Sequence, residues 1–197
     1  GKNVPLTAYR LSGVRTRSDV RRRRRFSGPL LGRTEQWEQA RQAYRAAVGG
    51  SGAALVTVVG DGGVGKSRLV DELIDDIGGG ATVLFGRALS YGEGLAYWPL
   101  AQALHGLDED GHPTWAERLG DVAHRDDIIL GLDTIAGTVG TAGGADGLQL
   151  AWAFRRLLEE LARTTPVVLV LDDVQWADDA VLDIALSVAE LSREAPI

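Results

Sequence analysis

The sequence predicts an α/β fold in which helices flank a parallel β-sheet. Short apolar runs occur at 53–59 (AALVTVV), 81–85 (ATVLF) and 167–171 (VVLVL), and the first is rich in β-branched residues. They alternate with segments of helical periodicity, an order typical of parallel sheets covered by helices. A glycine-rich stretch after the first run indicates that some ligand approaches the backbone closely there.

Composition limits the classes of protein that the chain can represent. Its 197 residues, 45% of them hydrophobic, suffice for one sizeable core. The absence of cysteine excludes disulfides, thiolate metal sites and cysteine catalysis, and it fits a reducing cytoplasm, where we expect the protein. The sequence contains no apolar run of membrane-spanning length and no signal peptide, so we expect no membrane partner.

Charge separates a basic segment from an acidic remainder. Residues 1–25 carry a net charge of +8, and the overall net charge is −6, so residues 26–197 carry −14. The run Arg21–Arg25 could bind nucleic acid, but no aromatic or polar base-reading groups are interleaved with it. A solvated connector is therefore favoured, and we expect residues 1–31 to be a basic linker that does not bind nucleic acid.

The first half of the chain contains two predicted helices around the first strand. Apolar residues recur at helical spacing over 34–48, with Thr34 as the expected N-cap. A second helix begins near Lys66 and precedes the strand at 81–85. Strand 53–59, the glycine-rich loop, this helix and strand 81–85 have the order of a βαβ unit, which predicts that the two strands are parallel.

The second half contains the third strand and further helices. Pro99 suits the first turn of a helix that runs to about Leu104, and helical signals near 114–137 are weak. A clear amphipathic helix covers about 150–161, and a last helix covers roughly 179–192. Pro166 introduces the strand at 167–171.

The glycine-rich stretch GDGGVGKS at 60–67 fits the P-loop pattern G-x-x-x-x-G-K-[ST] between a strand and a helix. Its glycines let successive N–H groups surround an anion, and the helix presents its positive end to the same phosphates. Lys66 can reach the β- and γ-phosphates, and the Ser67 hydroxyl can ligate Mg²⁺. A ligand-free turn is disfavoured because strand and helix are both in place. The predicted cofactors are ATP and Mg²⁺, and the predicted nucleotide contacts are Gly60, Gly62, Gly63, Val64, Gly65, Lys66, Ser67 and Arg68.

Two aspartates follow the third strand. Asp172 lies at its carboxyl end, the edge at which parallel sheets bind ligands. We expect Asp172 to hold the metal together with Ser67, and Asp173 to orient or activate the attacking water. Lys66 and Asp173 are thus the predicted catalytic residues.

Five stretches carry a family resemblance: LGRTEQ, GDGGVGKSRLVDEL, GRALSYGEGLAYWPLAQAL, AWAFRRLLEELA and PVVLVLDDVQWAD. In this order they span about 32–180. With them the chain resembles the AAA-like STAND P-loop ATPase module of bacterial signalling proteins. That module follows class III adenylate/guanylate cyclase domains and also begins LuxR-type regulators. The segment VPLTAYRLSGV resembles the tail that joins a cyclase domain to the module.

The resemblance implies further roles. It places Gly32 and Arg33 near the adenine, although Thr34 stands where the family usually has an acid. Trp176 and Asp178 match the tryptophan–acid pair that follows the second motif, and core packing is the alternative for Trp176.

The resemblance also implies a function, an ATP-binding and ATP-hydrolysing regulatory switch in a multidomain, cyclase-linked protein. Its expected partners are ATP or ADP, an upstream cyclase domain and a downstream helical or repeat region. The alternative is the nucleotide-sensing module of a LuxR-type transcription regulator. A small-molecule kinase is disfavoured because the second carboxylate lies on a separate strand.

Residues 32–197 are expected to form only part of such a domain. The chain starts at Gly1, contains no methionine, and stops as a new apolar segment begins. P-loop ATPases with the second acid on a separate strand place a further, central strand between the P-loop strand and that acidic strand. Here only residues 195–197 remain for it, so we expect the chain alone to be marginally stable and a weak or inactive ATPase.

Overall fold

The computed structural model describes residues 31–90, 96–108, 115–137 and 146–197. The basic linker 1–31, with its arginine run, therefore lies outside the described residues except for Leu31. The elements in chain order are α2 (Thr34–Ala46), the π-helical turn η1 (Ala47–Ser51), α3 (Lys66–Ile77), the 3₁₀ turn η2 (Gly78–Gly80), β1 (Thr82–Arg87), α4 (Trp98–Asp108), α5 (Trp115–Leu119), α6 (Arg125–Ala136), α7 (Gly147–Ala162), β2 (Val167–Asp172), the 3₁₀ turn η4 (Val174–Trp176) and α8 (Asp179–Leu191).

The described residues contain one sheet of two parallel strands, β1 and β2. Thr82 lies opposite Val167 at one end, and Arg87 lies opposite Asp172 at the other. The predicted α/β class, with a parallel sheet flanked by helices, is confirmed. Both strands extend further toward their carboxyl ends than the sequence predicts, and this extension brings Arg87 beside Asp172.

Helix α4 packs closely against β1. A Cβ atom at Gly86 would lie only 1.9 Å from the carbonyl oxygen of Pro99, so only glycine permits this approach. The backbone N–H of Arg87 also donates a 2.9 Å hydrogen bond to the side chain of Gln102. These two contacts fix the carboxyl end of β1 against the helix.

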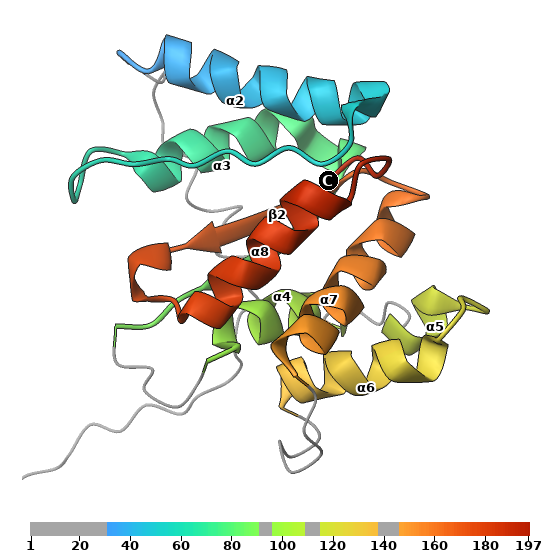
Figure 1. Cartoon of the computed structure of the whole chain (residues 1–197). Helices are drawn as coiled ribbons and strands as arrows, with labels where there is room; N and C mark the ends of the chain where they lie inside the picture. The colour runs from blue at the N-terminus through green and yellow to red at the C-terminus, as the bar shows by residue number, and fades with distance from the viewer. Residues whose placement is uncertain (1–30, 91–95, 109–114, 138–145) are drawn as a thin grey trace, which may run out of the picture.

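The main hydrophobic core lies between the two strands and the helices from α4 to α8 (Figure 1). Its largest fully buried side chain is Phe154 of α7, a helix with a clear amphipathic pattern in the sequence. The core also buries Leu100 and Leu104 from α4, Ile128 and Leu132 from α6, and Val181 and Ile184 from α8.

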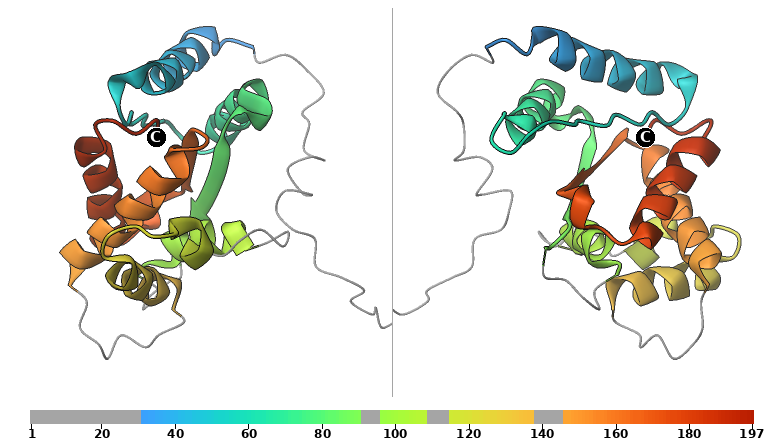
Figure 2. Two further views of the ribbon diagram at one scale, coloured as in Figure 1. Left: turned by 90° about the vertical axis from the view of Figure 1, so that its right-hand side faces the viewer. Right: turned by 60° about the vertical axis from the view of Figure 1, so that its left-hand side comes forward.

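Helices α2 and α3 form a separate pair at one end of the molecule (Figures 1 and 2). Arg41 Nε lies 3.1 Å from Asp76 Oδ2, and the same guanidinium lies 5.0 Å from the ring centre of Trp37. The Tyr44 hydroxyl donates to the carbonyl of Gly80 at 3.5 Å. Ala40 of α2 and Leu69 of α3 are buried, but neither belongs to the main core.

The predicted strand at 53–59 is wrong, and with it the βαβ unit that it was expected to begin. The stretch passes as an extended chain between α2 and the sheet (Figures 1 and 2) and joins neither β1 nor β2. Leu55, Val56 and Val59 are 58%, 46% and 87% exposed. Its composition favours an extended backbone, but a strand also needs a partner for its N–H and C=O groups.

Residues near the end of the chain lie between this stretch and β2. The N–H groups of Ala53 and Ala54 donate to the carbonyls of Ser192 and Ile197, each at 2.8 Å. The N–H of Val167, the first residue of β2, donates to Pro196 at 2.9 Å. Residues 196 and 197 thus bridge the two segments by backbone hydrogen bonds, and the expected central strand stays a prediction.

The helices follow the sequence prediction with shifted ends. Arg33, not Thr34, is the N-cap of α2, and it makes no side-chain capping bond. The helix expected at about 99–104 extends over Trp98–Asp108, and the weak signals near 114–137 correspond to the two helices α5 and α6. Among the described residues, no helix is both long enough and apolar enough to cross a membrane.

Candidate functional site

The glycine-rich loop ends at the start of α3, with Gly65 as the N-cap of the helix. Gly63 and Gly65 have φ of 81° and 94°, which residues with a Cβ rarely adopt. A Cβ at either position would meet no atom within 4 Å, so the loop is open on that side. No side chain caps α3, and the first-turn amides of a helix have no intrahelical partner. The loop therefore presents donors suited to an anion.

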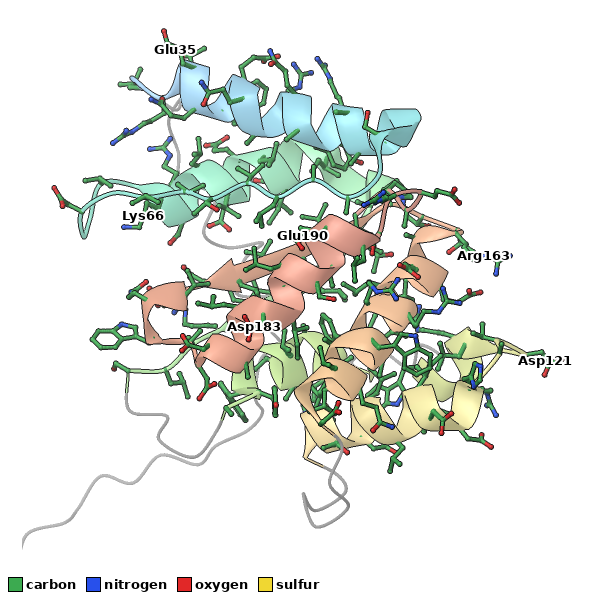
Figure 3. The ribbon with its side chains drawn as sticks, viewed as in Figure 1. Glu35, Lys66, Asp121, Arg163, Asp183 and Glu190 are labelled. Atoms are coloured by element: carbon green, nitrogen blue, oxygen red, sulfur yellow. The ribbon has the colours of Figure 1, made fainter. Side chains whose placement is uncertain are left out.

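The side chain of Lys66 folds back over the loop. Its Nζ donates to the carbonyls of Gly60 and Asp61, at 2.8 and 2.9 Å. The ammonium group is thereby held on the loop that is predicted to surround the phosphates. Figure 3 shows Lys66 at the end of α3 that carries this loop.

Arg33 adds a second cation beside the loop. Its Nη2 donates to the carbonyl of Val64 at 3.3 Å, although the two residues are 31 positions apart. Gly32, with φ of 67°, makes the turn that leads into α2. The structure thus brings the Gly32–Arg33 pair and the P-loop together.

Asp172 and Asp173 end β2 in a well-defined geometry. Asp173 has φ of 58° and ψ of 35°, in the left-handed region, and its N–H donates to Asp172 Oδ1 at 3.0 Å. The carbonyl of Asp172 accepts a 3.0 Å hydrogen bond from the N–H of Ala88. The P-loop and the carboxyl end of β2 lie at the same side of the molecule (Figure 1), but neither Lys66 nor Ser67 forms a hydrogen bond or ion pair with Asp172 in the described structure.

Arg87 binds both aspartates and was not predicted. Its Nε and Nη2 donate to Asp172 Oδ2, the former at 3.2 Å, and its Nε lies 3.3 Å from Asp173 Oδ2. The hydrogen bond to Asp172 raises the pKa of the guanidinium above its ordinary value; partial burial opposes this effect, and the charges of the two aspartates add to it. The sequence did hold a signal for Arg87: opposite charges at the carboxyl ends of two parallel strands.

The remaining site expectations have different outcomes. Trp176 is 57% exposed, so the core-packing alternative for it is wrong. Asp178 caps α8, because its Oδ1 accepts the N–H of Ala180 at 3.0 Å.

The residues present fit a magnesium nucleotide. Open glycines, uncapped first-turn amides and the Lys66 ammonium suit phosphate, while the Ser67 hydroxyl and the Asp172 carboxylate are hard oxygen ligands of the kind that Mg²⁺ prefers. In the described ranges, no three His, Cys, Asp or Glu side chains gather as a metal site of their own. A Mg²⁺ ion here would take most of its ligands from phosphate and water, as is usual for nucleotide sites.

This loop and acidic strand end define a P-loop nucleotide-binding protein. A family model described as AAA ATPase domain matches residues 29–196. The chain belongs to this family, and membership implies nucleotide binding, typically with Mg²⁺. A search of curated proteins and a search of solved structures gave no match.

Proposed function

We propose that the chain is the ATP-binding and ATP-hydrolysing switch module of a cytoplasmic bacterial signalling protein of the STAND type. The observation that carries the proposal is the glycine-rich loop at the start of α3, with Lys66 folded over it and Arg33 beside it. In such a switch, the γ-phosphate orders or releases neighbouring segments. The absence of cysteine supports a reducing compartment.

The proposed roles follow the two sequence motifs, the P-loop and the acidic end of β2. Lys66 binds the β- and γ-phosphates, Ser67 and Asp172 hold the Mg²⁺, and Asp173 orients the attacking water. The loop residues Gly60, Gly62, Gly63, Val64, Gly65 and Arg68 form the phosphate cradle. The contact between Arg33 and Val64 supports a position of Gly32 and Arg33 beside the nucleotide site, and the adenine-side role follows the family resemblance.

The proposed partners are further domains of the same polypeptide. Residues 1–31 would connect an upstream cyclase domain to the ATPase module of 32–197, and a helical or repeat region would follow. The resemblance of VPLTAYRLSGV to a cyclase tail supports this arrangement.

Binding of a fluorescent ADP analogue with Mg²⁺ tests the proposal. Lys66→Ala removes a charge-assisted phosphate contact of about 1.5–3 kcal/mol, so we expect affinity to fall about 10- to 100-fold. Arg163→Ala is the control, because Arg163 is 71% exposed, pairs with Glu160 at 3.1 Å and lies at the opposite end of the molecule from Lys66 (Figure 3). Equal affinities of the wild-type and Lys66→Ala proteins would refute the assignment.

A further inference from the structure

A single guanidinium joins the two acids that the proposed function assigns to metal and water. Arg87 contacts Asp172 through Nε and Nη2, and its Nε also lies 3.3 Å from Asp173 Oδ2. The side chain of Arg87 is 41% exposed, and those of Asp172 and Asp173 are 23% and 44% exposed. All three are thus accessible to an ion or ligand that arrives from solvent.

Backbone contacts hold this cluster in place. Strand register sets Arg87 opposite Asp172, and the N–H of Arg87 is anchored on Gln102 of α4. The left-handed backbone of Asp173 turns its N–H onto Asp172 Oδ1. The arginine therefore faces both carboxylates because of the fold, and not only because of one side-chain rotamer.

The hydrogen bonds that Asp172 already accepts leave few lone pairs of its carboxylate for a metal. Its Oδ2 accepts two N–H groups of Arg87, and its Oδ1 accepts the N–H of Asp173. A carboxylate oxygen has two lone pairs, so Oδ2 is saturated. The guanidinium also places a positive charge where a divalent cation, or its bound water, would approach.

We propose that Arg87 is a positioning residue that competes with Mg²⁺ for Asp172. Without Mg-nucleotide, the guanidinium of Arg87 contacts both aspartates. When Mg-nucleotide binds, the guanidinium leaves Asp172 but keeps its contact with Asp173 and so orients that carboxylate. Arg87 thus sets the Mg²⁺ concentration at which the site loads. This inference rests on the proposed function of the site.

The test is a Mg²⁺ titration of binding of a fluorescent ADP analogue to the 1–197 chain. If Arg87 competes with Mg²⁺, Arg87→Gln should lower the half-saturating Mg²⁺ concentration about three- to tenfold, the range expected for a partly exposed ion pair. Arg87→Lys keeps the charge but cannot contact both acids through two nitrogens, so a smaller decrease is expected. Direct binding of Mn²⁺, measured by electron paramagnetic resonance, should give the same ranking of metal affinity for the wild type, Arg87→Lys and Arg87→Gln without any turnover.

Arg163→Gln is the matched control, since it removes the same charge from an exposed pair far from the loop, and its Mg²⁺ dependence should equal that of the wild type. If Arg87→Gln does not fold, as judged by circular dichroism, Arg87→Lys carries the test. A merely structural role would reduce the amount of nucleotide bound without lowering the Mg²⁺ requirement. An unchanged or increased requirement in the folded Arg87 variants overturns the inference. A wild-type protein that binds no nucleotide overturns the proposed function and this inference with it.

Discussion

Asp173 has an unusual backbone conformation and an exposed carboxylate, so a substitution at this single residue can test its catalytic role separately from the fold. Its φ of 58° lies in the left-handed region, which Asn tolerates at least as well as Asp. Asp173→Asn should therefore keep the fold and the Mg-nucleotide affinity while removing the group proposed to activate water. In the longer parent protein that contains the complete ATPase domain, we expect phosphate release in a single turnover to slow by about 10²- to 10⁴-fold, the usual contribution of a general base.

Asp172→Asn is the matching variant for the metal. It should lose the Mg²⁺ dependence of nucleotide binding, whereas Asp173→Asn should retain it. Phosphate release at the wild-type rate by Asp173→Asn would remove Asp173 from the proposed mechanism.

The candidate site was predictable where its residues are neighbours in sequence. The P-loop glycines, Lys66 and Ser67 form a contiguous motif, and each has a local physical reason. Arg87 was missed because its partner Asp172 lies 85 positions away, and their contact depends on strand register. The left-handed backbone of Asp173 was also missed, because Asp tolerates this conformation but adopts it only where the surrounding structure requires it.

At the scale of elements, the contact between β1 and α4 depends on the missing side chain of Gly86. A Cβ there would lie 1.9 Å from a backbone oxygen of Pro99, which no change of side-chain rotamer relieves. Gly86→Ala should therefore lower the free energy of unfolding by about 3 kcal/mol, at the upper end of overpacking costs. Urea denaturation followed by circular dichroism measures the change.

Gly106 in α4 provides the matched control for Gly86. It is exposed, and a Cβ there meets nothing within 4 Å, so Gly106→Ala should stabilise the helix by about 0.5–1 kcal/mol. If Gly86→Ala were as stable as the wild type, the close packing of α4 on β1 would be wrong.

Elements were predicted well where their pattern alone determines them. Helix α7 has an unbroken amphipathic stripe, and Asp146 caps it by accepting the N–H of Gln149 at 2.7 Å. The stretch 53–59 has an equally clear strand composition, yet it forms no strand. Composition determines only a preference for an extended backbone. A strand forms only when a neighbouring strand makes regular backbone hydrogen bonds with it.

At the scale of the whole molecule, charge and exposed apolar surface are unevenly distributed. The segment 1–25 is strongly basic, while the remainder carries −14. Apolar side chains are exposed together on the stretch 53–59, which lies outside the sheet, and such patches promote association or partner binding.

This exposed stretch leads to a prediction about the entire chain. Leu55 and Val59 are 58% and 87% exposed, so the folded protein should bind a hydrophobic dye such as ANS. Changing both to Thr keeps side chains that favour an extended backbone but removes apolar surface. We expect dye fluorescence to fall by about half, with the free energy of unfolding changed by only about 0.5 kcal/mol, as for other surface changes. Leu148→Thr is the control, because Leu148 is 81% exposed but lies on α7, away from this stretch. An absence of dye binding by the wild type would show that 53–59 is covered in solution, and an equal loss in Leu148→Thr would show that the dye does not bind preferentially to this stretch.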